Sequence, residues 1–234
     1  MSDWKILCDF DGTIALDDVT DGLLESFARP GWERIEDEWR AGHIGSRRCM
    51  AEQIALLDVS RAELDALLDQ VEIDPVFPAF VAAARAAGVD LEVVSDGLDY
   101  AIERVLARHG LGGLVIASSA LEQIGARSWR LGFPYADPSC RSGSGTCKCA
   151  RAGGNAERDG AIVLIGDGRS DFCVAAAADL VLAKDSLAAH CRELALPHFE
   201  IGGFADALSL LPSLTTRFAA SRHASALQGS PSDA

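Results

Sequence analysis

Positive charge is scarce in this sequence. Of its 234 residues, 21 are lysine or arginine and 35 are aspartate or glutamate, which gives a formal net charge of −14. A field of this sign repels nucleic acid and anionic membrane surfaces, so we exclude both as partners. It also repels a phosphorylated metabolite, unless a metal ion and a few cationic side chains reverse the sign locally. Lysine occurs only at positions 5, 148 and 184, so each one can be considered separately.

Long hydrophobic runs are absent too. No stretch reaches the roughly 18 apolar residues that a membrane span requires, so we expect none. The opening residues MSDWKILCDF lack the basic region and the small-residue cleavage site of a secretory signal. The 7 cysteines are an odd number and do not show the spacing of a secreted disulfide framework, which favours reduced thiols. We therefore expect a cytoplasmic protein.

Patterns for zinc are missing as well. The 5 histidines are scattered and show no paired metal-ligand spacing, so we interpret them as structural or surface residues. Cys140, Cys147 and Cys149 lie in CRSGSGTCKC, which is not a zinc-ribbon spacing and has no histidine nearby. We interpret them as reduced loop thiols or as a redox-sensitive pair beside Lys148 rather than as a zinc site.

What is present is a change of periodicity along the chain. Residues 17–77 carry apolar side chains at helical spacing and no strand pattern, which predicts a small helical bundle. Before and after it, apolar strand patterns alternate with amphipathic helices, which is typical of a parallel sheet covered on both faces. We predict an α/β fold, a Rossmann-like doubly wound parallel sheet with an inserted helical cap. The expected core is 1–16 with 78–213, the cap is 17–77, and 214–234 is a flexible tail.

Polar residues follow three of the predicted strands. Asp9 and Asp11 stand at the end of the first strand, Ser95 and Asp96 at the end of the second, and Asp167 after AIVLIG. Ligands of open α/β sheets bind outside the carboxyl ends of the strands, so these residues are expected to meet there.

Carboxylates gathered in this way repel each other unless a cation lies between them. Asp171, four residues after Asp167, can point back to the same edge from the helix that starts there. Oxygen ligands without histidine suit Mg²⁺ rather than zinc. Lys148 is the only lysine between the second and third strand ends and can supply a fixed positive charge. Each motif alone also fits a turn or helix cap, and a lone lysine is usually solvated.

In this order, DFDGT, VVSDG, Lys148 and GDGRSD resemble the motifs of the haloacid dehalogenase (HAD) superfamily of phosphohydrolases, and the resemblance extends over essentially the whole chain. The helical insertion resembles the C1 cap of phosphoserine phosphatase-like members. Within the superfamily, the segments EWRAGHIGSRRC, VVSDGLDYAI, GTCKCA and LVLAKDSLAAHCRELALPHFEI resemble the methionine-salvage group that acts on 2-hydroxy-3-keto-5-methylthiopentenyl-1-phosphate.

The resemblance implies a role for each motif residue. Asp9 would be the nucleophile that forms an aspartyl-phosphate, and Asp11 would protonate the leaving oxygen and then activate water. Asp9, the backbone carbonyl of Asp11 and Asp167 would hold Mg²⁺, with Asp171 completing or supporting that site. Ser95 and nearby amides would hold the phosphoryl oxygens, and Lys148 would neutralise charge on Asp9 and the phosphate. An acid at position 11 argues against dehalogenation.

Substrate contacts are predicted from the residues around these motifs. Asp96 follows Ser95, whereas the phosphoserine phosphatases that this chain resembles have Ser-Gly at this place. We therefore expect that Asp96, with Gly97, either binds a substrate hydroxyl or points away from the phosphate. Ser46 and Arg47 begin a cap helix that is expected to face the site; the alternative is a helix cap and a solvated arginine. Trp39 lies on one helical face with Trp32 and Ile35, as a substrate wall or as bundle core.

The predicted function is a Mg²⁺-dependent phosphomonoesterase that acts on a small phosphorylated metabolite, with a methylthio-ketose phosphate as the implied substrate. A phosphoserine phosphatase and a phosphotransferase using the same aspartyl-phosphate stay open as alternatives. A non-catalytic phosphoryl-acceptor module fits less well, since it needs no cap and leaves Asp11 without a task. Either a monomer or a homodimer is compatible with the sequence.

Overall fold

One sheet runs through the described part of the chain, which in this computed structural model covers residues 4–153 and 160–228, with side chains to residue 219. The strand order is β4-β3-β2-β1-β5-β6-β7. Neighbouring strands pair in parallel except β3 and β4, which form an antiparallel hairpin. The strands are β1 (Trp4–Cys8), β2 (Asp90–Leu98), β3 (Val115–Gln123), β4 (Trp129–Gly132), β5 (Ala161–Gly166), β6 (Leu180–Ala183) and β7 (His198–Glu200).

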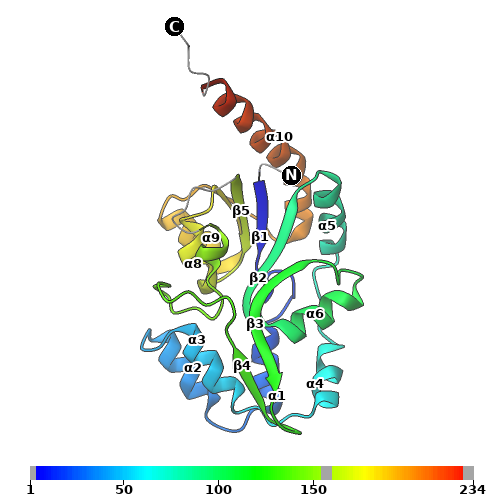
Figure 1. Ribbon diagram of the computed structural model, residues 1–234, viewed down its shortest axis with the longest axis vertical. Helices are drawn as coiled ribbons and strands as arrows, with labels where there is room; N and C mark the ends of the chain where they lie inside the picture. The colour runs from blue at the N-terminus through cyan, green and yellow to red at the C-terminus, as the bar shows by residue number, and fades with distance from the viewer. Residues whose placement is uncertain (1–3, 154–159, 229–234) are drawn as a thin grey trace.

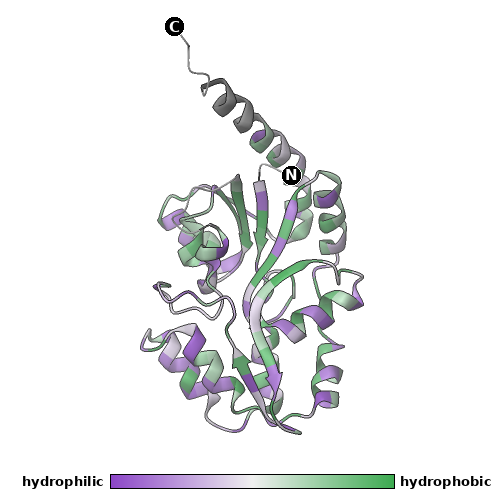
Figure 2. Ribbon diagram, in the orientation of Figure 1, coloured by the Kyte–Doolittle hydropathy of each residue, from purple (hydrophilic) through white to green (hydrophobic). Residues whose placement is uncertain are grey.

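The central strands are buried on both faces, which explains their nearly continuous apolar sequences. Alternate residues of β1 point to opposite sides: Ile6 and Cys8 join the larger hydrophobic cluster, and Leu7 joins the smaller one. Figure 2 shows the hydrophobic colouring concentrated along these strands.

Helices cover both faces of the sheet (Figure 1). The larger cluster receives side chains from α5 (Phe77–Ala86), α6 (Asp99–Arg108) and α10 (Phe204–Gln228). The smaller cluster receives them from α8 (Phe172–Ala175) and α9 (Asp185–Glu193), next to the short α7 (Lys148–Arg151). The predicted doubly wound α/β fold is therefore confirmed.

A group of helices is inserted between β1 and α5, as the sequence predicts. It contains α1 (Val19–Phe27), α2 (Trp32–Arg40), α3 (Ser46–Ile54) and α4 (Arg61–Leu68). Ser60 and Glu63 form the capping box that starts α4. The insertion lies beyond the carboxyl ends of the central strands, in the lower half of Figure 1. The domain boundaries at 16/17 and 77/78 stay predictions.

The core holds the α4 side of this cap at two places. On the β3–β4 hairpin, the Trp129 indole N–H donates to the carbonyl of Val59 at 2.8 Å. On α6, the Arg104 guanidinium donates to both carboxylate oxygens of Asp69, at 2.9 and 2.8 Å. One side of the cap is thus fastened to the core away from the strand ends.

Two expectations need correction, one about the C-terminal tail and one about the end of the second strand. The tail was expected to be loose from residue 214, but α10 continues to Gln228, and residues 229–234 lie outside the described part. Leu211, Leu214 and Phe218 are buried, because their spacing of three and four residues places them on one face of α10 against the sheet. The Phe218 ring lies 5.3 Å from the Trp4 ring, centroid to centroid.

The second strand is also longer than predicted. It does not end at Ser95 but continues to Leu98, because β3 extends beside it and pairs Leu98 with Ser119. The register shifts between Val94 and Leu98, so residues 95–97 form an irregularity in the strand. None of the helices in the described residues is long and apolar enough to cross a bilayer.

Candidate active site

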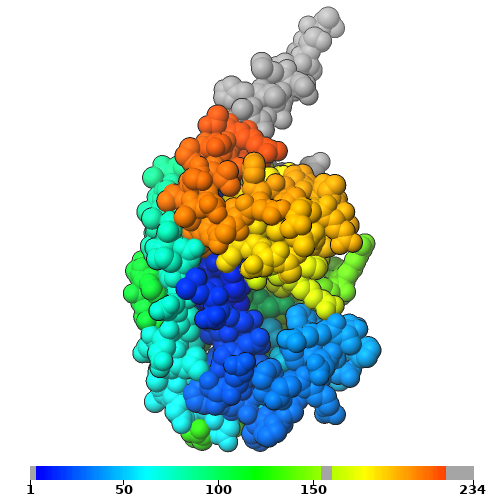
Figure 3. Space-filling model, turned by 180° about the vertical axis from the view of Figure 1, so that it is seen from behind, coloured from blue at the N-terminus to red at the C-terminus, as the bar shows by residue number. Residues whose placement is uncertain are grey.

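The carboxyl ends of β1, β2 and β5 meet next to the cap, at a cavity of about 670 Å³. Core segments that follow these strands line one side, and α2 and α3 of the cap line the other. Figure 3 shows a recess between the blue cap segments and the green and yellow segments of the core. The lining includes Asp9, Asp11, Ser95, Asp96 and Asp167. The convergence of strand ends expected from the sequence is therefore present.

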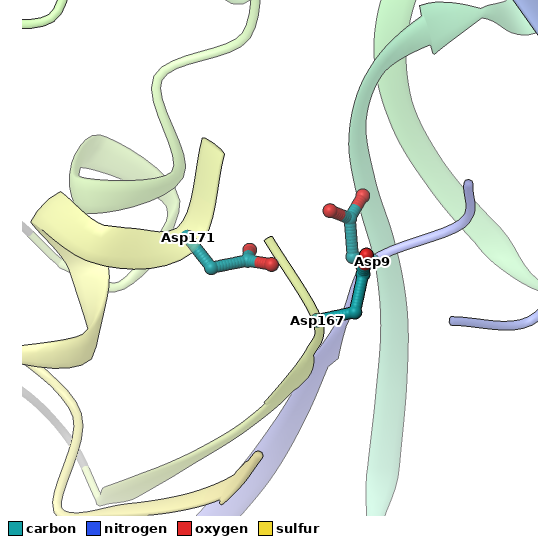
Figure 4. Close-up of side chains that lie close together, drawn as sticks. All are labelled: Asp9, Asp167 and Asp171. Atoms are coloured by element: carbon teal, nitrogen blue, oxygen red, sulfur yellow. The ribbon is translucent and has the colours of Figure 1, made fainter. Parts of the chain in front are cut away.

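Three carboxylates approach one another at the floor of this cavity. Asp9 follows β1, Asp167 follows β5, and Asp171 ends a 3₁₀ turn, η1 (Arg169–Asp171), that precedes α8. One oxygen from each lies within 4.8 Å of the others, and Figure 4 shows their side chains directed to the same place. Asp9 and Asp171 are buried, with 5% and 0% of their surface exposed.

Lys148 is the fixed cation beside these carboxylates. It is 3% exposed, and its Nζ lies 2.5 Å from Asp9 Oδ2 and 2.6 Å from Asp171 Oδ1. Burial opposes its charge, but Asp171 and Asp9 outweigh burial and raise the pKa of Lys148 above its ordinary value. The lysine therefore stays charged at neutral pH.

One lysine does not balance three carboxylates. Burial, and then repulsion from Asp9, raise the pKa of Asp171 well above its usual range, although Lys148 opposes this. The same two causes raise the pKa of Asp167 to about 6. Asp171 Oδ2 is buried and has no hydrogen-bond partner. A hard divalent cation would balance the excess negative charge and use this oxygen, so the residues present fit Mg²⁺.

The glycines beside the cluster leave room for its carboxylates. A Cβ on Gly12 would lie 2.6 Å from Asp167 Oδ2, and the backbone there has φ +67°, which disfavours other residues. A Cβ on Gly166 would overlap Asp171 Oδ2. Gly12 and Gly166 thus allow the close approach that the site requires.

Asp11 lies apart from the three carboxylates and beside the phosphate-binding candidates. Its Oδ1 accepts from the backbone N–H of Val19 at 2.9 Å. Burial, and then repulsion from Asp18, raise the pKa of Asp11 well above its usual range, against the effect of the Val19 N–H. A protonated carboxyl at this place can donate to a leaving oxygen.

Ser95 and Gly97 are packed closely against Asp11. The buried Ser95 hydroxyl accepts from the Gly97 N–H at 2.9 Å. A Cβ on Gly97 would lie 2.6 Å from Asp11 Oδ2 and 3.0 Å from Ser95 Oγ. Gly97 lines the cavity, and this close approach explains why a glycine stands there; its contact to a substrate stays a prediction.

The remaining predicted substrate residues fall into different places. Asp96 and Ser46 line the cavity but bond to each other, with Ser46 Oγ donating to Asp96 Oδ2 at 2.6 Å. Trp39 lines the cavity, with the Arg169 guanidinium 5.3 Å from its ring centre. Trp32 packs against the hydrophobic core instead. The Arg47 side chain is exposed and is not part of the lining, so the expected substrate contact is not found.

Several site residues were not singled out from the sequence. Ser170 donates to Asp9 Oδ2 at 3.1 Å and accepts from Lys148 at 3.0 Å. Thr13 donates to Asp167 Oδ1 at 2.8 Å, and Lys184 donates to the carbonyl of Gly12 at 2.7 Å. Thr13 and Ser170 stand inside the DFDGT and GDGRSD motifs, and Lys184 directly follows β6, so membership of a motif and position at a strand end were the available signals.

The cysteine-rich loop shows no zinc site. All 7 cysteines are free thiols. Among the residues that the structure describes, the only group of three or more potential metal-ligand side chains is that of Asp9, Asp167 and Asp171.

Known proteins resemble this chain in sequence and in fold. The family model for haloacid dehalogenase-like hydrolases matches residues 6–176. A 2-hydroxy-3-keto-5-methylthiopentenyl-1-phosphate phosphatase of Geobacillus thermodenitrificans is 32% identical over 215 residues, covering 89% of this chain and 96% of the relative. The Geobacillus kaustophilus protein of the same name is 32% identical over 212 residues, covering 88% of this chain and 94% of its own length.

Solved structures agree on the fold. A HAD family hydrolase from Salmonella enterica serovar Typhi has a TM-score of 0.65 at 20% identity, over 90% of this chain and 70% of that one. A substrate-bound phosphoserine phosphatase has a TM-score of 0.63 at 16% identity, over 89% of this chain and 98% of that one. The resemblance inferred from the four motifs is confirmed, and so is the prediction of an enzyme of the phosphatase type. The chain belongs to the haloacid dehalogenase-like hydrolase family.

Proposed function

We propose that this protein is a Mg²⁺-dependent phosphomonoesterase that hydrolyses a small phosphorylated metabolite through an aspartyl-phosphate at Asp9. The placement of Asp9 is the observation that carries the proposal. Its carboxylate lines the cavity, is held by Lys148, and lies within one cluster with Asp167 and Asp171. A nucleophile, a fixed cation and a candidate metal site therefore meet at one point.

The contacts of Asp9 suit a nucleophile that must be oriented before it reacts. Oδ1 accepts from the Phe10 N–H at 2.8 Å, and Oδ2 accepts from Lys148 and Ser170. In the first step an Asp9 oxygen forms a bond to phosphorus while the bond from phosphorus to the leaving oxygen breaks. Catalysis of phosphoryl transfer depends mainly on positioning the reacting groups and stabilising their charge, and these contacts supply both.

Asp11 supplies and then recovers a proton. Its raised pKa favours the protonated carboxyl that can donate to the leaving oxygen. The resulting carboxylate takes a proton from water as that water attacks the phosphorus of the aspartyl-phosphate. The bond from Asp9 to phosphorus breaks, and both aspartates return to their starting state. Ser95 lies beside Asp11, where its hydroxyl can bind a phosphoryl oxygen.

Mg²⁺ would be held by the side chains of Asp9 and Asp167 and by the Asp11 carbonyl, with Asp171 completing or supporting the site. When bound, it supplies positive charge that makes an anionic nucleophile and an anionic phosphate compatible. Thr13 orients Asp167 by donating to one of its oxygens.

A methylthio-ketose phosphate is the substrate that we propose. The support is the 32% identity over 89% of this chain to a relative named for 2-hydroxy-3-keto-5-methylthiopentenyl-1-phosphate. The cap side of the cavity adds physical support, because Trp39, Ile44 and Met50 offer apolar surface beside the polar Gln53. A thioether tail and a hydroxylated carbon chain both find matching surface there.

Hydrolysis of p-nitrophenyl phosphate by wild type and Asp9→Asn, with Mg²⁺ and with EDTA, tests the reaction. We expect turnover that requires Mg²⁺ and falls on the order of 10⁴-fold in Asp9→Asn. Asp90→Asn is the matched control, since Asp90 is exposed at the opposite end of β2. Turnover that survives in Asp9→Asn would contradict the nucleophile.

A panel of phosphate esters then tests the substrate. The methylthio-ketose phosphate is expected to give the highest kcat/KM, ahead of phosphoserine. An added alcohol acceptor distinguishes hydrolysis from phosphotransfer, because transfer yields the phosphorylated alcohol instead of inorganic phosphate. Preference for phosphoserine would refute the substrate assignment and leave the reaction intact.

A further inference from the structure

We propose that Asp96 is a positioning residue that couples the seating of cap helix α3 to the placement of Lys148. The inference rests on the proposed function for its catalytic readout, and on contacts within the chain for its mechanism. Asp96 follows Ser95 in the irregular part of β2, between the phosphate-binding candidates and the cap.

Both carboxylate oxygens of Asp96 are already engaged. Oδ2 accepts from the Ser46 hydroxyl at 2.6 Å, and Oδ1 accepts from the Thr146 N–H at 2.7 Å. The Asp96 backbone is held as well, since Ser119 Oγ on β3 donates to its carbonyl at 2.9 Å. A carboxylate with two internal donors and a fixed backbone is suited to joining segments rather than to binding a substrate hydroxyl.

Thr146 connects this carboxylate to the catalytic lysine. It stands two residues before Lys148, the first residue of α7, and is 1% exposed. The chain between β4 and α7, residues 133–147, contains no helix or strand that would fix the start of α7. The start of α7 is instead held by single contacts, among them the Asp96–Thr146 hydrogen bond and a hydrogen bond from the Cys147 N–H to the Tyr135 carbonyl at 2.9 Å.

The start of α3 lies directly against the same loop. Besides Ser46, the Arg47 N–H donates to the carbonyl of Gly143 at 3.0 Å. A Cβ on Gly45 would lie 2.9 Å from that carbonyl oxygen, so the two backbones are in close contact. Three consecutive cap residues thus touch the loop or its anchor Asp96.

The consequence is a mechanical link from the cap to the reacting atoms. With α3 seated, Ser46 and Thr146 share Asp96, and Lys148 reaches Asp9 and Asp171. With α3 displaced, Asp96 loses one of its two donors and the loop loses its contact to Arg47. Full placement of the lysine then depends on a closed cap, so the site is complete only when the cavity is closed.

Asp96→Ala, Asp96→Asn and Ser46→Ala test this link, with Ser60→Ala as the control. Ser60 also begins a cap helix, but it caps α4, and neither it nor any other α4 residue lines the cavity. Asp96→Ala is expected to lower kcat by about 10- to 100-fold, the effect of displacing a catalytic group by about 1 Å, with little change in KM. Asp96→Asn keeps an acceptor for Thr146 and an amide that can donate to Ser46, so it is expected to restore most of kcat.

The choice of ester separates positioning from substrate binding. p-Nitrophenyl phosphate has no hydroxyl on its leaving group, whereas glycerol 1-phosphate has two. A positioning residue lowers kcat equally on both. A rise in KM confined to glycerol 1-phosphate, with kcat unchanged, would show a direct substrate contact and overturn the proposal while leaving the proposed function intact.

Thiol labelling tests the same link without catalysis. Cys147 lies between Thr146 and Lys148 and is 3% exposed. Its labelling by a maleimide, located by peptide mass spectrometry, is expected to be faster in Asp96→Ala and Ser46→Ala than in wild type and Ser60→Ala. Unchanged labelling in both variants overturns the proposal. If wild type hydrolyses no ester, the proposed function fails, and labelling still decides whether Asp96 holds the loop.

Discussion

Replacing Lys148 with methionine removes the buried positive charge and keeps a side chain of similar length. The lysine is 3% exposed and lies 2.5 Å from Asp9 and 2.6 Å from Asp171. Removing one partner of a buried ion pair costs about 3–5 kcal/mol, because water cannot replace the lost charge. We expect the free energy of unfolding to fall by about this amount in EDTA at pH 8.

Lys5→Met is the matched control. The Lys5 side chain is 36% exposed, and its Nζ lies 3.8 Å from Glu92. It also donates to the carbonyl of Arg151 at 2.8 Å. A partly solvated ion pair and one hydrogen bond together predict a cost of about 1 kcal/mol. The same substitution at two of the three lysines thus separates burial from charge.

The cost of Lys148→Met should also depend on pH in a defined direction. In wild type the raised pKa of Lys148 means that its stabilisation is complete below the unfolded lysine pKa, near about 10.4, and is lost only above it. Without the lysine, the already raised pKa of Asp171 rises further. A carboxyl whose pKa is higher in the folded than in the unfolded protein lowers the free energy of unfolding as the pH rises from the unfolded pKa to the folded pKa. The cost is therefore largest at pH 8 and smaller at pH 5, by up to about 1.4 kcal/mol per pH unit for each carboxyl.

Urea unfolding followed by circular dichroism in EDTA, at pH 8, 6.5 and 5, measures these differences. The reasoning is refuted if Lys148→Met is as stable as Lys5→Met at pH 8. It is refuted equally if the cost of Lys148→Met grows as the pH falls, since that would mean that the remaining carboxylates do not take up protons in the folded state.

Three further predictions concern the metal, the acid and one glycine. Mg²⁺ at 100 times its Kd is expected to stabilise wild type by about 2.7 kcal/mol in thermal unfolding and Asp171→Asn by less; no shift in wild type would contradict the metal site. On glycerol 1-phosphate, kcat/KM is expected to fall as the pH rises through the raised pKa of Asp11. Asp11→Asn should lose more activity on this ester than on p-nitrophenyl phosphate, because the nitrophenolate leaving group needs no proton. Equal losses on the two esters would exclude Asp11 as the acid. Gly97→Ala places a Cβ 2.6 Å from Asp11 Oδ2 and is expected to lower kcat about tenfold or more, whereas Gly22→Ala meets nothing within 4 Å and should leave kcat unchanged.

Much of the candidate active site was predictable because it depends on local sequence. Asp9 and Asp167 each follow an apolar strand directly, and parallel strands end at a common edge, so their proximity follows from the fold class alone. Lys148 was identified because the chain contains so few lysines. The cap helices were predictable for a similar reason, since each carries its own apolar spacing and α4 its own capping box.

Other features could not be predicted because they depend on partners far away in sequence. The loose tail was a wrong prediction, because the apolar face of α10 is buried only by contact with residues far away in sequence, such as Trp4 of β1. Likewise, nothing near Asp96 indicates that Ser46, 50 residues earlier, and Thr146, 50 residues later, occupy its two oxygens.

The sequence by itself determined the fold class, the helical insertion and the identity of the carboxylates at the strand ends, because periodicity and strand-end position are properties of short segments. Only the tertiary structure decided in which direction the pKa values of these carboxyls are shifted, which of them pair with Lys148, and whether Asp96 is engaged by other segments of the chain. Burial and distance set those outcomes, and both arise when segments distant in the chain are packed against one another.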